Sequence, residues 1–599
     1  MLSVINTKDE EPTDAPRPPE FNVSSKMKIS LFNEIRLEGN YHDAVIRVED
    51  AEFKTHKIIL CNCSPFFGAL FKYQSTANMV FDIYGLSPDS MQLIIEYAYT
   101  DSVTVTKDNV EELLLAADML NVIALVQACS DFLSGQLCPE NCIGIWQLTN
   151  VVKCELRHRA HHYITHHFEE VFPCDEFLQL SVQELAGILD RDELNVKTES
   201  TVFTAISRWI CHRSEEREKH TAMLLSKVRL ALTTMRCIYT DLMSNDLVMN
   251  NPECQQMASE AIKAIQWKIR RKFPVSGFRN VLARPRLPCV ILLAVGGWRA
   301  NNPISDIEAF DVCAGQWVKV AHSLECPRAY HGTVCLDGFL YCVGGTDQRE
   351  RFNRVSKMDL KTHAWHEVSP MYYGRCYVSV TVLEGIIYAI GGFDGYSRLR
   401  SAERYQPETN QWNCIASMHF SRSDASCTTL HDKVYVCGGY DGHQCLETAE
   451  FYNPETDQWS IIAPMNSRRT GLGVIAHAEQ IYAIGGCQSS IRHSSAEVYN
   501  PQTNTWHVLS SMLTPRSSFG LGVINDQIYV VGGFTGLSAN KKVEYYNSDL
   551  DRWSLASDIE RVRTALSCCV LTEIPNLSEY IVPRDSLPLL QLEDEADAS

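Results

Sequence analysis

Six pairs of adjacent glycines recur through the second half of the chain, and they constrain its fold more than any other feature. Each pair follows a short apolar run, and a tryptophan lies 21 positions after the first glycine of the pair. An arginine then recurs every 47 residues. Because three residue types stay in register over six periods, this half is predicted to be an array of structural repeats. The pairs begin at Gly296, Gly344, Gly391, Gly438, Gly485 and Gly532; the tryptophans are Trp317, Trp365, Trp412, Trp459, Trp506 and Trp553; the arginines are Arg328, Arg375, Arg422, Arg469, Arg516 and Arg563.

Each repeat reads as four short strands. In YVSVTVLEGIIYAIGGFDGYSRLRSAERYQPETNQWNCIASM, two apolar strands flank a turn at Glu384-Gly385, and two more follow the glycine pair. Four strands in 47 residues are typical of a propeller blade. Only one strand, CVILLAV, precedes Gly296, whereas RTALSCCVL after Trp553 is a spare strand. We therefore expect residues 564–571 to complete the first blade and to close a six-bladed ring without free edges.

The rest of the chain divides by composition and periodicity. Residues 1–26 are polar and are expected to be disordered. Residues 27–136 mix helix and strand signals, including the N-cap pair Ser87-Pro88, and predict a compact α/β domain. Residues 137–272 carry helical periodicity throughout and predict an all-α domain.

Two segments flank the predicted propeller, which spans residues 289–571. Residues 273–288 belong to a basic, proline-containing run and are predicted to be a linker. A nuclear-localisation signal is the alternative interpretation of this run. Residues 572–599 are predicted to be a mobile acidic tail.

Composition indicates a soluble, cytoplasmic protein. Apolar residues make up 45% of the chain and charged residues 21%, with no run of 18 apolar residues and no pattern of a signal peptide. The 23 cysteines are then expected to be reduced thiols. A net charge of −19 argues against nucleic acid and membrane surfaces as partners.

Several phrases resemble known domains. HDAVIRV, FKTHKIILCNCSPFFGALF, IIEYAYT and LLLAADML occur in the order of a BTB (POZ) domain, and NCIGI, DELNV and VFTAISRWI resemble a BACK domain. The glycine pairs, the tryptophans and the tyrosines before Asn-Pro or Gln-Pro resemble kelch repeats. The chain is thus identified as similar to the kelch-like family. This resemblance implies a multidomain fold with an α/β BTB domain, an all-α BACK domain and an all-β six-bladed kelch propeller.

The resemblance also implies a function. Kelch-like proteins are substrate-recognition adaptors of cullin-3 ubiquitin ligases and form homodimers through the BTB domain. The loop KYQSTANMVFDI lacks the hydrophobic-x-Glu motif with which adaptor BTB domains often bind the cullin. Phrases such as LRSAERYQPETNQW are similar to a member that acts in germ cells, which implies a role in spermatogenesis. Carried onto this sequence, the dimerisation residues are Ile29, Phe32 and Ile35, and the cullin-binding residues are Asn141, Ile143, Ile145 and Leu148.

The substrate, an unknown protein, is expected at one mouth of the propeller. The stretch after each glycine pair varies between repeats and is rich in arginine and aromatic residues, which dominate binding hot spots. Cations on an acidic protein favour a partner segment of acidic character. The predicted substrate-binding residues are Trp298, Arg299, Tyr330, Thr346, Tyr377, Phe393, Arg398, Tyr440, Cys487 and Phe534.

Other chemistry is not favoured by the residues. The run HHYITHH, from His161 to His167, could gather imidazoles for a metal, but a plain helical face is the favoured interpretation. The cysteine pairs lack a second, properly spaced pair for structural zinc. No nucleotide-binding or hydrolase motif occurs, so we expect no catalysis, cofactor or metal.

Two other protein classes were open alternatives. A dimeric scaffold for cytoskeletal (actin) filaments would use the same propeller and BTB domain without a ligase role. A transcriptional BTB protein would need a DNA-binding module, and none is visible in the sequence.

Overall fold

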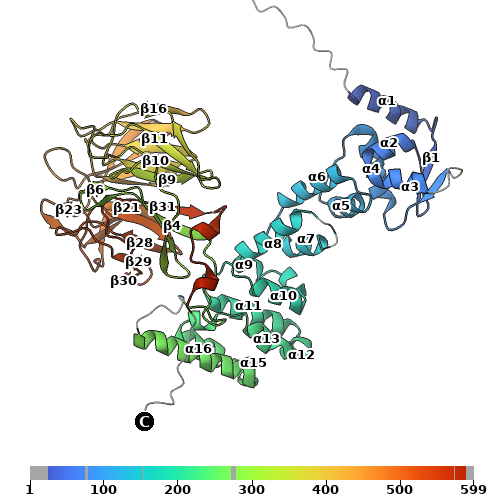
Figure 1. The fold of residues 1–599 in the computed structure, drawn as a ribbon, viewed down its shortest axis with the longest axis horizontal. Coiled ribbons are helices and arrows are strands. Elements are labelled where there is room, and N and C mark those ends of the chain that lie inside the picture. The colour runs from blue at the N-terminus through green and yellow to red at the C-terminus, as the bar shows by residue number, and fades with distance from the viewer. Residues whose placement is uncertain are drawn as a thin grey trace, which may run out of the picture. The chain divides into compact units, whose positions relative to one another are not determined.

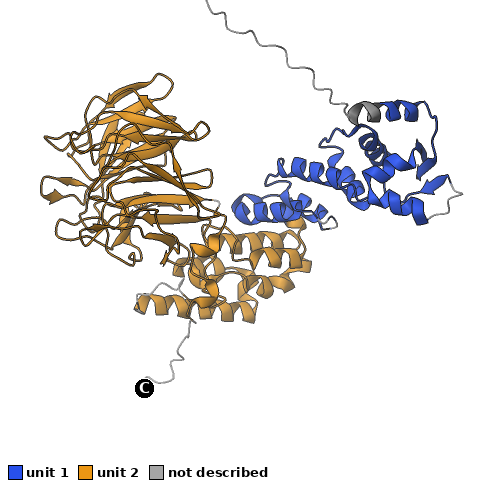
Figure 2. Cartoon of the chain, turned by 45° about the horizontal axis from the view of Figure 1, so that its top comes forward, with its two compact units in different colours: residues 1–177 blue, residues 178–599 orange. Residues whose placement is uncertain are grey.

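The computed structural model describes residues 25–73, 79–150, 152, 154–271, 278–572 and 574–588, with only the backbone for residues 25–30 and 271. The chain forms two compact units that span residues 1–177 and residues 178–599 (Figure 2). An α/β domain, a helical segment and a β-propeller follow one another, as predicted (Figure 1). Among the described residues, no helix is both long and apolar enough to cross a membrane.

The first unit begins with a three-stranded sheet and the helices around it. Strand β1 pairs antiparallel with β2 and parallel with β3. The side chains of Ile46, Phe67 and Ile94 are fully buried. The Ser87 side chain accepts a hydrogen bond from the Ser90 N–H and begins α4, as predicted. The elements are α1 Ser25–Leu37, β1 Ala44–Val48, β2 Ala51–Thr55, α2 Lys57–Cys63, α3 Pro65–Tyr73, β3 Val80–Asp82, α4 Pro88–Thr100, α5 Val110–Met119, α6 Ile123–Ser134, α7 Cys142–Leu148, α8 Leu156–His166 and α9 Phe168–Val171.

The second unit begins with helices that are tied to the linker before the propeller. The boundary between the units falls inside the predicted helical domain of residues 137–272. Arg286 of the linker is buried and lies 2.6 Å from the Glu199 carboxylate. Arg284 lies 2.6 Å from Asp192. These helices are α10 Val182–Leu189, α11 Glu199–His212, α12 Ser214–Arg217, α13 Thr221–Leu225, α14 Met235–Cys237, α15 Asp246–Met249 and α16 Pro252–Arg271.

Six four-stranded antiparallel sheets follow (Figure 1). Their strands, from the innermost outward, are β31 Ser567–Thr572, β4 Val290–Val295, β7 Ile307–Asp311, β8 Gln316–Lys319; β9 Gly332–Leu336, β10 Phe339–Val343, β11 Val355–Asp359, β12 Trp365–Val368; β13 Ser379–Leu383, β14 Ile386–Ile390, β15 Ala402–Gln406, β16 Gln411–Ile415; β17 Ser426–Leu430, β18 Lys433–Cys437, β19 Ala449–Asn453, β20 Gln458–Ile462; β21 Gly473–His477, β22 Gln480–Ile484, β25 Ala496–Asn500, β26 Thr505–Leu509; and β27 Gly520–Ile524, β28 Gln527–Val531, β29 Val543–Asn547, β30 Arg552–Leu555. Two small ribbons add β5 Trp298–Arg299 with β6 Asn302–Pro303, and β23 Cys487–Gln488 with β24 Ile491–Arg492.

The ring closes as the sequence predicted. Strand β31 comes from the end of the array and pairs antiparallel with β4, from Ser567 opposite Val295 to Thr572 opposite Val290. The inner strands β9, β13, β17, β21, β27 and β31 each contact the next, and β31 contacts β9. The first blade is therefore built from both ends of the repeat array, which leaves no open seam between the first and last blades.

The recurring tryptophans link neighbouring blades. The indole N–H of Trp459 donates to the Ala416 carbonyl oxygen of the preceding repeat at 2.7 Å. The Trp317 indole makes the equivalent bond to Ser557 at 2.9 Å, across the closing seam. Each tryptophan thus fills the space between two sheets and satisfies its buried donor there. The other four bonds are Trp365 to Ser323, Trp412 to Ser369, Trp506 to Ala463 and Trp553 to Ser510.

The recurring arginines are buried and join successive glycine pairs. The Arg422 carbonyl oxygen accepts a hydrogen bond from the Gly392 N–H at 2.7 Å. Its guanidinium donates to the Gly438 carbonyl oxygen of the next pair at 2.8 Å. A Cβ on Gly391 would lie 2.4 Å from the Arg422 carbonyl oxygen, so only glycine admits this approach. The other five arginines make the same two contacts: Arg328, Arg375, Arg469, Arg516 and Arg563.

Five of these arginines also pair with a buried glutamate. Burial alone would raise the pKa of Glu450, but Arg422 at 2.8 Å and hydrogen bonds from His419 outweigh it and hold that pKa below its ordinary value. Arg328 differs, because Ser356 stands where the glutamate would be. The pairs are Arg375–Glu403, Arg422–Glu450, Arg469–Glu497, Arg516–Glu544 and Arg563–Glu308, the last of which closes the ring.

The C-terminal segment differs from the prediction of a mobile tail beginning at residue 572. Residue 572 itself belongs to strand β31, and residues 574–588 pack against the second unit. The Tyr580 side chain is fully buried, and Arg584 lies 2.6 Å from Asp311 of β7. Residues 589–599 lie outside the described part. The acidic composition concealed an apolar anchor, because buried residues such as Ile581 and Leu587 alternate with the polar ones.

We predict that Arg422→Met lowers the free energy of unfolding of the propeller by about 3–5 kcal/mol, because it leaves Glu450 buried without a cationic partner. Arg354→Met removes an exposed pair with Glu350 and should cost less than about 1 kcal/mol. Urea unfolding of the full chain, followed by tryptophan fluorescence, measures both. Equal losses in the two variants would show that the buried arginine is not a main support of the ring.

Candidate functional site

The residues that follow the glycine pairs are held at one end of the blades. Phe393 forms backbone bridges with Cys376, which precedes the inner strand β13, and with Arg398, which returns from the variable loop. Tyr440 and Phe534 occupy the same place in later repeats. The glycine pair therefore delivers each of these side chains to the same end of the propeller as the start of the inner strand. We call this end the mouth.

A closed ring of backbone hydrogen bonds forms the neck of the mouth. The Tyr377 N–H donates to the Tyr330 carbonyl oxygen at 2.9 Å, and the Tyr330 N–H in turn donates to the Ala565 carbonyl oxygen at 3.0 Å. Each residue of the ring lies two positions after a recurring arginine and has a positive φ angle. The arginines thus fix the neck, while its side chains are free to differ. The members in order are Tyr330, Tyr377, Asp424, Gly471, Ser518 and Ala565.

Arginines and aromatic rings contact one another at the mouth. The Arg398 guanidinium carbon lies 4.0 Å from the Phe393 ring centre and 5.5 Å from that of Tyr440. Arg492 lies 5.1 Å from the Phe534 ring centre. Such cation–π contacts orient the guanidinium groups and leave their edges available to a ligand.

The tyrosines of the neck continue this surface. The Tyr330 and Tyr377 ring centres are 4.0 Å apart, and Trp298 lies 6.4 Å from Tyr330. All three side chains are half-buried. We call the side chains of Trp298, Tyr330, Tyr377, Phe393, Arg398, Tyr440, Arg492 and Phe534 the mouth cluster.

Three arginines share one position of the repeat. Arg351, Arg398 and Arg492 all lie on the strand that returns from the variable loop, and this position holds Cys445 and Ala539 in the other two aligned repeats. The Nε atoms of Arg351 and Arg492 are buried and make no hydrogen bond within the described chain. Each of these two guanidinium groups therefore has one donor that no described group satisfies.

Asp424 is an acidic side chain in the neck that the sequence analysis missed. Burial raises its pKa to about 6, although a hydrogen bond from Thr470 and the charges of Arg398 and Arg492 oppose the shift. The signal was present in the sequence, because Asp424 occupies the repeat position of Tyr330 and Tyr377, which were predicted.

Two of the ten predicted substrate residues are buried rather than displayed. Thr346 is 6% exposed, and its hydroxyl donates to the Glu350 carbonyl oxygen to hold the loop together. Cys487 is 9% exposed. Arg299 is half-exposed on β5. The remaining predicted positions belong to the mouth cluster.

The helix predicted to form the dimer presents apolar side chains to solvent. Leu31, Phe32 and Leu37 of α1 are exposed by 56%, 39% and 70%. Ile35 is half-buried, and the side chain of Ile29 lies outside the described part. Exposed apolar side chains on a helix are consistent with a partner surface.

Two of the four predicted cullin-binding residues are buried in this structure. Ile143 and Ile145 of α7 are 1% and 5% exposed, so they belong to the core. The Asn141 side chain closes a turn by donating to the Gln136 carbonyl oxygen, and Leu148 is half-buried. These residues were carried over from the family resemblance, which does not show which side chains of the helix pack inward.

Another apolar surface lies on the first unit. Tyr84, Leu115, Met119 and Ile123 are exposed by 79%, 37%, 42% and 70%. Leu115 and Met119 are one turn apart on α5, and Met119 lies against Gly85, the neighbour of Tyr84. We call these four residues the α5 patch.

The remaining candidates behave as ordinary structural groups. The rings of His162 and His166 on α8 are 3.7 Å apart, and His166 Nδ1 lies 3.0 Å from the His162 carbonyl oxygen. Burial raises the pKa of the Cys63 thiol to about 11 and that of Cys142 to about 12, which disfavours the reactive thiolate.

Comparison with known families agrees with this architecture. The BTB/POZ domain family matches residues 32–137, and the BACK family (BTB And C-terminal Kelch) matches residues 142–241. The kelch motif matches residues 291–322, 327–372 and 515–559, and the KLHDC2/KLHL20/DRC7 Kelch-repeats domain matches residues 374–533.

Among curated proteins, the chain is similar to Kelch-like protein 3 of Mus musculus, Bos taurus and Homo sapiens. Each is 35% identical over 322 residues, which are 53% of this chain and 54% of the relative. The similarity therefore spans about half the length of these relatives.

We predict that Asp424 makes the stability of the propeller depend on pH. Because its pKa is raised, the folded state favours the neutral acid, and this contribution is present at low pH and lost as pH rises through about 6. Asp424→Asn should therefore melt at a higher temperature than the wild type at pH 7.5, and the difference should disappear near pH 4. A difference that does not change with pH would contradict the assignment.

Proposed function

Because this chain is a BTB–BACK–kelch protein, we propose that it is a substrate-recognition adaptor of a cullin-3 RING ubiquitin ligase. In this proposal the BTB and BACK domains bind cullin-3, and the mouth of the propeller binds the protein to be ubiquitinated. The adaptor performs no chemical step itself. It holds the substrate at high effective concentration beside the enzyme that carries ubiquitin.

The mouth cluster is the observation that carries the proposal. It combines cations with exposed faces of aromatic rings, the residue types that dominate protein–protein hot spots. The whole chain carries a net charge of −19, so cations gathered at one place favour a specific electrostatic partner. We infer that the bound segment contains a carboxylate next to an apolar side chain.

The neck adds a selective element to this site. The Asp424 carboxylate lies near the charges of Arg398 and Arg492, and it is the negative group that an acidic ligand would meet. When Asp424 is ionised it repels such a ligand, and when it is neutral it can donate a hydrogen bond. Asp424 occupies the repeat position that holds Tyr330 and Tyr377 in two earlier blades, and its protonation state would change the net charge of the mouth.

Dimerisation would double the number of mouths. We propose that α1, with Leu31, Phe32 and Leu37 exposed, forms the interface with a second copy. Two propellers on one dimer can bind two segments of the same substrate, which raises the overall affinity without new contacts.

We propose the α5 patch as part of the cullin surface in place of Ile143 and Ile145. It supplies an apolar area on the domain that the family uses for this partner. Its apolar side chains can compensate for the hydrophobic-x-Glu motif that the loop from Lys72 to Ile83 lacks.

Two finer proposals rest on sequence composition and on sequence resemblance, respectively. We propose a cytoplasmic location, and we propose a role in spermatogenesis because several phrases resemble kelch-like protein 10. Expression of the protein in testis, and male infertility on its loss, are the observations that test the second statement.

We predict that Arg398→Ala and Phe393→Ala each weaken substrate binding by about tenfold or more, because both remove part of the mouth cluster. Proximity labelling in cells with the full chain, the two variants and Arg552→Ala identifies the substrate. Arg552 is exposed on the outer strand β30 and serves as the matched control. Substrates are labelled by the wild type and by Arg552→Ala but not by the mouth variants. Identical sets of proteins for all four chains would contradict recognition at the mouth.

We predict that the full chain binds cullin-3 at micromolar concentration and that Met119→Arg abolishes this binding by placing a charge in the α5 patch. Tyr41→Arg changes an exposed residue outside that patch and should bind normally. If Met119→Arg bound cullin-3 as the wild type does, the α5 patch would be rejected as a cullin surface, but the adaptor proposal would stand. Failure of the wild type to bind would reject the adaptor proposal and favour a cytoskeletal scaffold.

A further inference from the structure

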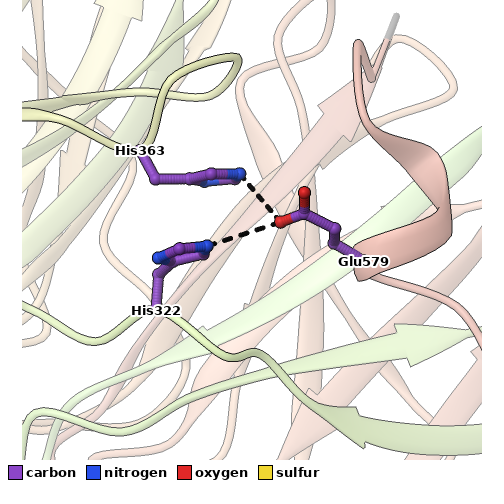
Figure 3. Close-up of side chains that lie close together, drawn as sticks. All are labelled: His322, His363 and Glu579. Atoms are coloured by element: carbon purple, nitrogen blue, oxygen red, sulfur yellow. Dashed lines mark ion pairs between the residues drawn. The ribbon is translucent and has the colours of Figure 1, made fainter.

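Two histidines of the propeller meet a glutamate of the C-terminal segment. His322 follows β8 of the first blade, His363 lies in the turn between β11 and β12 of the second, and Glu579 ends a short helical turn of residues Leu577–Glu579. The imidazole rings stack with centres 3.8 Å apart and planes inclined by 9° (Figure 3). Their Nε2 atoms lie 2.8 Å (His363) and 3.5 Å (His322) from the same carboxylate oxygen, Oε2 of Glu579.

Three polar atoms of this cluster are buried and have no hydrogen-bond partner in the described part of the chain. Only 9% of the His363 side chain is exposed, and neither of its ring nitrogens makes a hydrogen bond within the described chain. Glu579 Oε2 is also buried without a hydrogen bond. Buried polar atoms without partners are costly and uncommon in folded proteins. A nitrogen and an oxygen that lie 2.8 Å apart without hydrogen-bond alignment are close enough to move onto one shared ion.

We propose that His322, His363 and Glu579 bind a zinc ion. Two imidazoles and one carboxylate are a common zinc ligand set, and imidazole selects transition metals over calcium and magnesium. The three ligand atoms lie within 4.8 Å of one another. Tetrahedral zinc with bonds of about 2.1 Å needs them roughly 3.4 Å apart. The stacked rings are nearly parallel, so their Nε2 lone pairs do not converge on one point in this structure. His322 and Glu579 are 40% and 36% exposed, and both side chains must turn for the three ligand atoms to surround the ion.

The proposed site would be a structural metal site with one coordination position open to solvent. The exposed edge formed by His322 and Glu579 leaves the fourth position to water. The ion would join the first blade, the second blade and the C-terminal segment. Further along the C-terminal segment, Tyr580 is fully buried and Arg584 lies 2.6 Å from Asp311. The bound ion would therefore add one more contact that holds this segment on the propeller.

Zinc titration of the full chain tests the proposal. After treatment with a chelator, added Zn²⁺ should raise the melting temperature of the wild type and of His366→Gln, which replaces an exposed histidine three residues from the site. Glu579→Gln keeps the side-chain shape and removes the carboxylate, whereas His322→Gln removes an imidazole; each should weaken the Zn²⁺ affinity by roughly tenfold or more. Circular dichroism of each variant before titration verifies that it is folded.

The visible absorption of bound Co²⁺ provides a second readout, which does not depend on the stability of the fold. Co²⁺ bound by two nitrogens and one oxygen gives visible absorption without the intense near-ultraviolet band of a thiolate ligand. We expect that spectrum in the wild type and in His366→Gln, and its loss in Glu579→Gln. An equal response of all variants to Zn²⁺, a thiolate spectrum, or no response of the wild type would each overturn the site and leave the cluster as an ion pair.

Discussion

The recurring buried arginine is the interaction on which the propeller depends. Its carbonyl oxygen is held by one glycine pair and its guanidinium by the next, as Arg422 shows with Gly392 and Gly438. A buried glutamate neutralises five of the six arginines, so five connections between blades are both hydrogen-bonded and ionic, and the one at Arg328 is hydrogen-bonded only. The two residues after the arginine then lead directly into the neck, where six backbone bonds close a second ring. The fold and the position of the site therefore have one cause.

This division of labour explains how the mouth can vary without loss of the fold. The glycines, arginines, glutamates and tryptophans make equivalent contacts in successive blades, and the side chains of the arginines, of their glutamate partners and of four of the tryptophans are buried. The side chains between these recurring residues do not make the same structural contacts from blade to blade. One repeat position holds Arg351, Arg398 and Arg492 but also a cysteine and an alanine, and the neck holds both Tyr377 and Asp424. The residues at the mouth can therefore change without loss of the contacts that hold the blades together.

Much of the fold could be predicted because the repeats are local and periodic. Strand order, the number of blades and the closing strand all follow from spacing in the sequence. Burial of single residues could not be predicted in this way. Ile143 and Ile145 lie on an apolar helical face whose partner is set by tertiary packing, and Thr346 points into its own loop. The C-terminal segment was predicted as a tail because its charges conceal the few apolar residues, such as Tyr580, that anchor it.

The central claim is that the mouth, rather than any other face of the propeller, holds the partner. Hydrogen–deuterium exchange of the full chain, with and without a partner captured by proximity labelling, tests this most directly. We predict slower exchange in the loops 393–400 and 440–445, which carry Phe393, Arg398 and Tyr440. We predict no change in the turns 384–385 and 431–432, which lie at the opposite ends of the same strands. Protection of those turns with unchanged exchange at the mouth would contradict the account.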